Sequence, residues 1–212
     1  MRAVMREGQS QPRISLREAS IDPTTVGVGA LAGLAGEITI DHGEVWVTRF
    51  VDGKAVTTGP ACVAADEATL LSIGALRNPT TTLCEEVVAG TALEDAVARA
   101  LRAAQRSDTT ASLSPSLFMI EGTATSLRAH VIAGTCAHAD PTADALRLAI
   151  DTPVDVNIIG LYAENREGVL THHGTRVHMH AIFIRDGARM TAHVDALTLD
   201  ANAKITVPVS RD

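Results

Sequence analysis

Three histidines in the last third of the chain have a spacing that suits metal-ion chemistry, because neutral imidazole is a common metal ligand. His178 and His180 are two residues apart, so on a β-strand both side chains point to the same face. Asp186-Gly187 is typical of a two-residue type I′ hairpin turn, in which both central positions need a positive φ. A turn there places His180 directly opposite His193, in a non-hydrogen-bonded pair where side chains approach closely. The sequence therefore predicts three imidazoles on one face of a β-hairpin.

Three nitrogen ligands with one position left open are typical of catalytic zinc sites. The other face of the same hairpin is apolar and is expected to pack in the core: Val177, Met179, Ala181, Phe183, Met190, Ala192 and Val194. The alternative is that the histidines are ordinary members of a polar face with no metal. The metal hypothesis depends on the turn at Asp186-Gly187, because one inserted or lost residue would change the register.

Other polar residues near the hairpin are weaker candidates. The same register puts Asp195 opposite His178, where it can orient a metal ligand through a hydrogen bond. Arg176 and Arg189 share the histidine face and could bind a substrate carboxylate, but solvated charges at strand ends are the favoured interpretation. His172-His173 is interpreted as an exposed loop, with the rim of a pocket as the less favoured interpretation.

Composition narrows the class of protein. The 212 residues carry a net charge of −7 with no basic run, which argues against a nucleic-acid partner. The N-terminus has no apolar stretch behind its charges, and the glycine-rich segment 26–35 is too short to span a membrane. Cys62, Cys84 and Cys136 form no CxxC pair and are expected to be buried free thiols in a reducing compartment. We therefore expect a cytoplasmic protein with a small-molecule partner.

The order of predicted elements is strands, then helices, then strands. Residues 1–20 are expected to be a loose N-terminal arm, and residues 21–212 a single domain. Helices are predicted over 65–76, 91–106 and 140–150, and strands over 36–40, 44–50, 54–58, 117–125, 127–133, 154–163 and 203–209, besides the histidine hairpin. This order favours an α+β fold with two mostly antiparallel sheet regions, a few helices and the metal site on a β-hairpin.

Three segments resemble the α-acetolactate decarboxylase family. The run VGVGALAGLAGEITIDHGEVW is similar to that family's glycine-led approach to an L-x-G-E strand. The run SLFMIEGTATSLRAHV is similar to its strand around an x-G-T turn, and VHMHAIFIRDGARMTAHVDAL to its H-x-H…G-H-V zinc segment. The three segments keep the family order and nearly span the chain.

This resemblance implies a zinc enzyme that converts 2-acetolactate to acetoin and carbon dioxide. It implies that His178, His180 and His193 are the zinc ligands, the same residues that the hairpin register brings together. It also places Glu37 beside the metal as a ligand or an acid/base group. Without the resemblance, a solvated strand carboxylate is the simpler interpretation of Glu37.

The sequence departs from the family pattern at three places. Two extra residues lie between the second and third histidines, an even number that keeps the side chains on the same face. The family has an arginine eight residues past the glycine of the x-G-T turn, Gly122 here; that position holds His130, with Arg128 two residues earlier. Arg128 is a candidate to bind the substrate carboxylate; the alternative is that Arg128 is a charged residue on the protein surface. His130 is a candidate for another catalytic role. The family also has a site carboxylate near its C-terminus, and Asp212 is a poor match for that residue.

Three functions remain open from the sequence. The first is the zinc-dependent decarboxylase, with a hydroxy-keto acid as substrate. The second is a metalloenzyme of the same fold that acts on a different hydroxy-keto acid, which the altered arginine position favours. The third is a non-catalytic homologue that binds a metal or a small acid. No membrane partner is expected, and a homodimer is left open beside a monomer.

Overall fold

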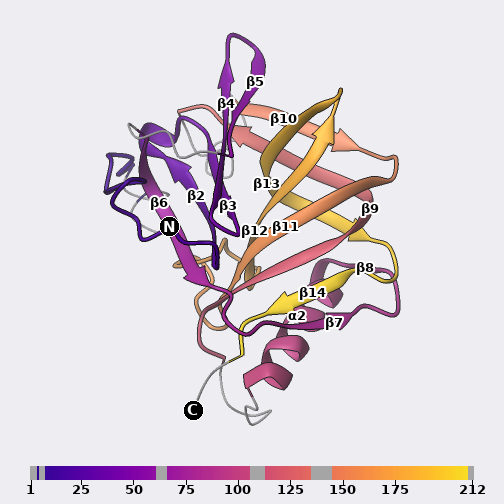
Figure 1. Ribbon diagram of the computed structural model, residues 1–212. Coiled ribbons are helices and arrows are strands. Elements are labelled where there is room, and N and C mark those ends of the chain that lie inside the picture. The colour runs from indigo at the N-terminus through magenta and orange to yellow at the C-terminus, as the bar shows by residue number, and fades with distance from the viewer. Residues whose placement is uncertain (1–3, 5–7, 61–65, 106–112, 135–144, 210–212) are drawn as a thin grey trace.

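The computed structural model describes residue 4 and residues 8–60, 66–105, 113–134 and 145–209 (Figure 1). Two antiparallel sheets make up most of the described chain, with one α-helix among the described residues. The predicted class, mostly antiparallel sheet in two regions with some helix, is confirmed. No helix among the described residues is long and apolar enough to cross a membrane.

The first sheet is built largely from hairpins. Its strand order is β1 (Ile14–Ser15), β6 (Glu67–Ala75), β2 (Thr25–Leu31), β3 (Glu37–Asp41), β4 (Glu44–Val51) and β5 (Lys54–Thr58), with the short 3₁₀ turn η1 (Ala32–Leu34) between β2 and β3. Two-residue turns at His42-Gly43 and Asp52-Gly53 have positive φ at both positions, as a type I′ turn requires. These turns fix the registers of β3 with β4 and of β4 with β5.

The second sheet closes on itself around β9. Its order is β7 (Thr80–Leu83), β14 (Lys204–Val207), β9 (Ser116–Ile132), β11 (Val154–Tyr162), β12 (Val177–Arg185), β13 (Ala188–Leu199) and β8 (Val88–Ala89), and β10 (Ala145–Ile150) pairs with β9. The first half of β9 pairs with β11 and its second half pairs with β13. Strands β9, β11, β12 and β13 therefore form a closed ring, which holds the β12–β13 hairpin from both sides.

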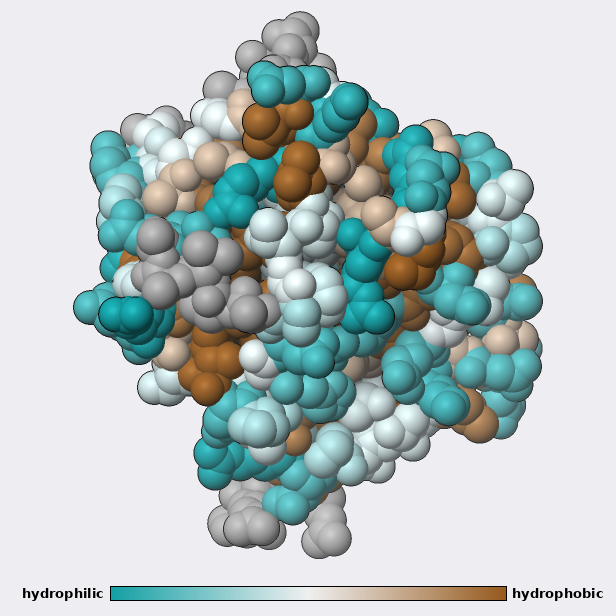
Figure 2. Space-filling model, turned by 45° about the horizontal axis from the view of Figure 1, so that its top comes forward, coloured by the Kyte–Doolittle hydropathy of each residue, from teal (hydrophilic) through white to brown (hydrophobic). Residues whose placement is uncertain are grey.

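Helix α2 (Gly90–Gln105) covers the second sheet near β14 (Figure 1). The predicted apolar stripe is buried as expected: Leu93, Val97, Ala100, Leu101 and Ala104. It belongs to the main core together with the apolar face of the hairpin. On the face seen in Figure 2, apolar residues lie in small groups between polar ones.

Two predicted helices are wrong where the structure describes them. The segment 65–76 contains strand β6, which is paired on both sides, with β1 and with β2. Residues 145–150 form strand β10, paired along its whole length with β9. In both places strand pairing outweighs the helix propensity of alanine and leucine. The other parts of these two predictions, residue 65 and residues 140–144, lie outside the described residues.

The segment before residue 21, expected to be a loose arm, contacts the first sheet. Strand β1 pairs with the start of β6, and Leu16 is buried. The Thr69 hydroxyl donates a hydrogen bond to the Ser10 carbonyl at 2.5 Å. The two strands expected over 117–125 and 127–133 are one continuous strand, β9.

The two sheets are joined by hydrogen bonds between threonines and by an apolar cluster. The Thr191 amide on β13 donates to the Thr48 hydroxyl on β4 at 3.0 Å, and the Thr191 hydroxyl contacts that of Thr39 on β3. Beside them an apolar cluster joins residues of both sheets, including Val28 and Ile182. The face of the hairpin that carries the histidines is therefore turned toward the first sheet.

Candidate metal centre

The turn that joins β12 and β13 has the predicted form. Asp186 and Gly187 both have a positive φ, 51° and 78°. Arg185 pairs with Ala188, and His180 pairs with His193. The apolar side chains predicted on the other face all lie in or against the main core. The register derived from the sequence is confirmed from the turn out to the pair of His180 and His193.

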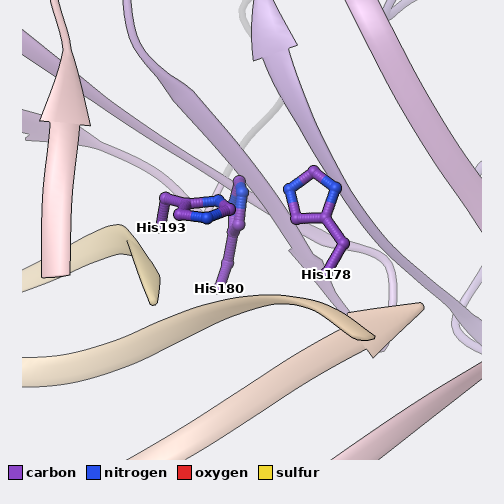
Figure 3. A group of neighbouring side chains, drawn as sticks. All are labelled: His178, His180 and His193. Carbon is purple, nitrogen blue, oxygen red and sulfur yellow. The ribbon is translucent and has the colours of Figure 1, made fainter. Parts of the chain in front are cut away.

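The three predicted histidines form one cluster (Figure 3). One ring nitrogen of each of His178, His180 and His193 lies within 4.8 Å of those of the other two. The ring centroids are 4.9 Å apart for His178 and His193, 5.2 Å for His178 and His180, and 5.5 Å for His180 and His193. All three side chains are buried. This group of nitrogens is close enough to hold one metal ion.

Burial keeps two of these imidazoles neutral. It lowers the pKa of His180 to about 3, and it lowers the pKa of His193 well below the ordinary value of 6.5, with neighbouring imidazoles adding to the effect. A neutral imidazole has a lone pair for a metal, whereas an imidazolium has none. His180 Nδ1 lies 3.2 Å from the Thr39 hydroxyl, which fixes the ring and directs Nε2 toward Glu37.

Glu37, the first residue of β3, brings a carboxyl group from the other sheet to this cluster. Its side chain is 3% exposed, and Oε2 lies 3.5 Å from His180 Nε2. Oε1 accepts a hydrogen bond from the Ile132 amide at 3.2 Å. Burial raises the pKa of Glu37 to about 7, although His130 and the Ile132 amide act in the opposite direction. Near neutral pH both protonation states are populated, as an acid/base group requires.

His130 also lies at the cluster, on β9 directly opposite His193. It is 2% exposed, and its ring centroid is 4.8 Å from that of His193. Its Nδ1 lies 2.9 Å and 3.0 Å from the two carboxylate oxygens of Asp195. Asp195 was expected opposite His178; it instead sits where the register of β13 with β9 shifts, which turns it to His130.

Arg128 does not point to the cluster, and the expectation that it approaches the metal pocket is wrong. Its guanidinium lies 2.7 Å from a carboxylate oxygen of Asp151, and the side chain is 45% exposed. Arg128 and His130 lie two residues apart on β9 and so share a face, but Arg128 pairs with Ala149 near the end of β10 and its side chain reaches Asp151, which follows that strand.

The two other arginine candidates also have partners away from the histidines. Arg176 is bound to Glu94 and Asp95 on α2, at 2.9 Å and 2.8 Å. The Arg189 guanidinium lies over the Trp46 ring, 4.6 Å from its centroid. The structure therefore brings neither of them to the cluster through these contacts.

His172 lies at the cluster, against the exposed-loop interpretation. Its ring centroid is 5.1 Å from that of His193 and 5.6 Å from that of His178. The loop is held by Thr171, whose hydroxyl donates to the Thr175 carbonyl, and by Thr175, whose hydroxyl donates to Glu94. No regular spacing links His172 to the hairpin. Its position just before β12, which carries His178 and His180, was the one feature of the sequence that pointed to the cluster.

A cavity of about 510 Å³ adjoins one side of the cluster. His172, His193 and Asp195 line it, together with residues at the start of α2 and at the diverging ends of β12 and β13. Its volume suits a small molecule. The cluster thus contains neutral imidazoles and lies beside a carboxyl group of raised pKa and a cavity. Nitrogen ligands with a nearby carboxylate fit a divalent ion such as zinc.

Known proteins resemble this chain in structure rather than in sequence. No protein-family model and no curated relative matches the sequence. Acetolactate decarboxylase from Bacillus subtilis subspecies spizizenii matches with a TM-score of 0.73 and 16% identity, over 99% of this chain and 83% of that chain. Alpha-acetolactate decarboxylase from Bacillus subtilis strain 168 matches with a TM-score of 0.69 and 16% identity, over 98% of this chain and 82% of that chain.

A third structure, from Staphylococcus aureus, is of a protein of unknown function described as similar to alpha-acetolactate decarboxylase. It matches with a TM-score of 0.59 and 12% identity, over 94% of this chain and 78% of that chain. Identities this low establish the fold alone. The chain has the fold of acetolactate decarboxylase.

Proposed function

We propose that this protein is a zinc-dependent decarboxylase that converts 2-acetolactate to acetoin and carbon dioxide. The observation that carries the proposal is the cluster itself: three buried histidines with a buried carboxyl group, Glu37, 3.5 Å from one of them. The fold shared with two acetolactate decarboxylases supports the same reaction.

His178, His180 and His193 would hold the ion, with Nε2 of His180 fixed by the hydrogen bond at Nδ1. A bound divalent ion would supply Lewis-acid stabilisation for the negative charge that develops as carbon dioxide leaves. The keto and hydroxyl oxygens of acetolactate are placed to chelate one ion, so the substrate suits a site with an open position.

Glu37 is the group that moves the proton. When the bond to the carboxylate breaks, its electron pair stays on the carbon that carried the carboxylate. Acetoin forms when that carbon takes up one proton, so the overall reaction consumes one proton for each carbon dioxide released. A protonated Glu37 can donate it, and burial of this carboxyl group favours its protonated form by raising its pKa in the metal-free protein.

Activity tests this proposal directly. Purified protein loaded with zinc is incubated with racemic acetolactate and assayed for acetoin, beside protein stripped with a chelator and protein reloaded after stripping. We expect acetoin from the loaded and reloaded samples only. A zinc-loaded, folded protein that forms no acetoin above the spontaneous rate would contradict the assignment.

A second candidate is an enzyme of the same fold that acts on a different hydroxy-keto acid. The observation that favours it is the arrangement at β9, where Arg128 is bound to Asp151 while His130, with Asp195 at its Nδ1, lies at the cluster. Assaying the same preparation against other 2-hydroxy-3-keto acids for release of carbon dioxide separates the two candidates.

A further inference from the structure

Strand β3 contacts both nitrogens of the His180 ring. Glu37 and Thr39 are two residues apart on this strand, so both side chains point to the hairpin. Glu37 Oε2 lies 3.5 Å from Nε2, and the Thr39 hydroxyl lies 3.2 Å from Nδ1. The Ile38 carbonyl between them accepts a hydrogen bond from the ring. One strand of the first sheet therefore orients a metal-ligand candidate that belongs to the second sheet.

Thr39 is a polar residue at a fully buried strand position. Its exposed fraction is 0%, and so is that of Thr191 on β13. The two hydroxyl groups are hydrogen-bonded to each other, and the Thr191 amide donates to the Thr48 hydroxyl at 3.0 Å. Valine has nearly the same shape and suits such a position, whereas a buried hydroxyl costs free energy unless it is paired. The Thr39 hydroxyl has two side-chain partners among the described residues, His180 and Thr191.

The hydrogen bonds around Thr39 suit a metal ion at Nε2 of His180. A neutral imidazole that binds a metal through one nitrogen carries its proton on the other. With the metal at Nε2, Nδ1 is the donor and the Thr39 oxygen is an acceptor. The hydroxyl hydrogen of Thr39 is then donated to the oxygen of Thr191, so each group has a partner. The opposite direction, from Thr39 to Nδ1, would place the ring proton on Nε2 and block the metal.

We propose that Thr39 is a positioning residue of the metal centre, whose oxygen holds the proton of His180 on Nδ1 and leaves Nε2 to the metal ion. Thr191 supports this role, because it accepts the hydroxyl hydrogen of Thr39. The inference rests on the metal site of the proposed function and does not depend on the substrate. It makes the packing of the two sheets part of what sets the affinity for zinc.

The zinc affinity of matched threonine variants tests this role. Thr39→Val keeps the shape of the side chain and removes the hydroxyl, and Thr39→Ser keeps the hydroxyl. Thr69→Val is the control, because Thr69 is 2% exposed in the same sheet and its hydroxyl donates to the Ser10 carbonyl rather than to a histidine. Competition with a chelator of known affinity gives the dissociation constant for zinc. Urea denaturation with excess chelator gives the stability of each metal-free protein.

Thr39→Val should bind zinc about 10- to 100-fold more weakly than wild type, the usual effect of removing a hydrogen-bond partner from a metal-ligating histidine. Thr39→Ser and Thr69→Val should bind zinc as wild type does, although Thr69→Val also loses a buried hydroxyl. A zinc affinity of Thr39→Val equal to that of wild type would overturn the inference. An equal loss of affinity in Thr69→Val would do the same, because a loss that follows stability alone requires no contact with His180.

Imidazole ¹⁵N NMR of the wild type tests the tautomer and covers the case in which Thr39→Val fails to fold. The His180 signals are assigned by their loss in His180→Ala. In the zinc-loaded protein we expect the ring proton of His180 on Nδ1 and zinc on Nε2. Zinc on Nδ1 with the proton on Nε2 would contradict the role of Thr39, because its oxygen would then have no ring N–H to accept.

The outcomes for Thr39 are separate from those for the proposed function. A wild type that binds zinc, with the predicted loss in Thr39→Val, but makes no acetoin would reject the decarboxylase and leave the inference standing. Acetoin from zinc-loaded wild type, with no change of zinc affinity in Thr39→Val, would reject the inference alone. A wild type that binds no zinc would overturn both.

Discussion

His180 and His193 are directly opposite each other in the β12–β13 ladder, with ring centroids 5.5 Å apart. This relationship follows from the two-residue turn at Asp186-Gly187, because the turn fixes which residues face each other. His178 joins them by strand alternation alone. The candidate metal centre therefore depends on backbone register rather than on loops, and rigid elements position ligands well.

The first prediction concerns the three histidines. Each single change, His178→Ala, His180→Ala or His193→Ala, should remove most of the bound zinc, because two nitrogens seldom hold zinc tightly. The measurement is metal content per chain after dialysis against a weak chelator. His42→Asn is the control, since it removes an exposed imidazole from a turn and keeps a residue that tolerates positive φ. Full metal retention in all three variants would remove these residues as ligands.

The second prediction concerns Glu37. Glu37→Gln keeps the shape of the side chain and the acceptor for the Ile132 amide but cannot donate or take up a proton. We expect a folded protein that still binds zinc and turns acetolactate over about 10²–10⁴ times more slowly, the usual effect of losing an acid/base group. Steady-state kinetics with a parallel zinc assay measures this. Turnover near that of wild type would mean that Glu37 moves no proton.

The third prediction concerns Arg128. Because its guanidinium is bound to Asp151 on the surface, Arg128→Lys and Arg128→Gln should change turnover less than about twofold and stability by less than about 1 kcal/mol. Kinetics and urea denaturation give the two values. A large rise in KM for both variants would show that the arginine reaches the substrate after all.

The fourth prediction concerns acid stability of the metal-free protein. The pKa values of His180 and His193 are lowered from 6.5 on folding, so their contribution is present above pH 6.5 and is lost as the pH falls below it. Glu37 acts in the opposite sense, since its pKa is raised from 4.5 to about 7: its contribution is present below pH 4.5 and lost as the pH rises through 7. Two groups outweigh one, so the free energy of unfolding should fall from pH 6.5 to 4.5 and more steeply below.

Urea denaturation in the presence of a chelator, at a series of pH values, measures this trend. Glu37→Gln should steepen the fall between pH 6.5 and 4.5, because it removes the opposing group. A free energy of unfolding that rises toward pH 4.5 would contradict the neutral, buried state of the two imidazoles.

The hairpin was predictable from sequence because its information is local. The turn at Asp186-Gly187 needs a backbone conformation that few residues adopt, and the alternation on either side gives each side chain its face. Helix α2 was predictable for a similar reason: its apolar stripe lies within one segment. Strand β6 was not, because its alanines and leucines carry no clear alternation and its pairing with β2 is set by the whole sheet.

The sequence was less informative about residues that reach the cluster from outside the hairpin. Glu37 came only from the family resemblance, since a single carboxylate on a strand gives no sign of being buried. His130 and Arg128 could not be separated, because alternation puts both on one face of β9, and the partner of Arg128, Asp151, depends on the placement of β10, which was predicted to be a helix. His172 was assigned to an exposed loop because a loop residue has no periodicity from which to infer its neighbours.

The most direct test of the metal centre is the zinc K-edge X-ray absorption spectrum of the reloaded wild-type protein. The cluster of His178, His180 and His193 predicts one zinc ion per chain with three imidazole ligands at about 2.0–2.1 Å and light-atom scattering in the remaining positions. Fewer than three imidazoles, or sulfur scattering at about 2.3 Å from a cysteine, would contradict a zinc site built on this hairpin.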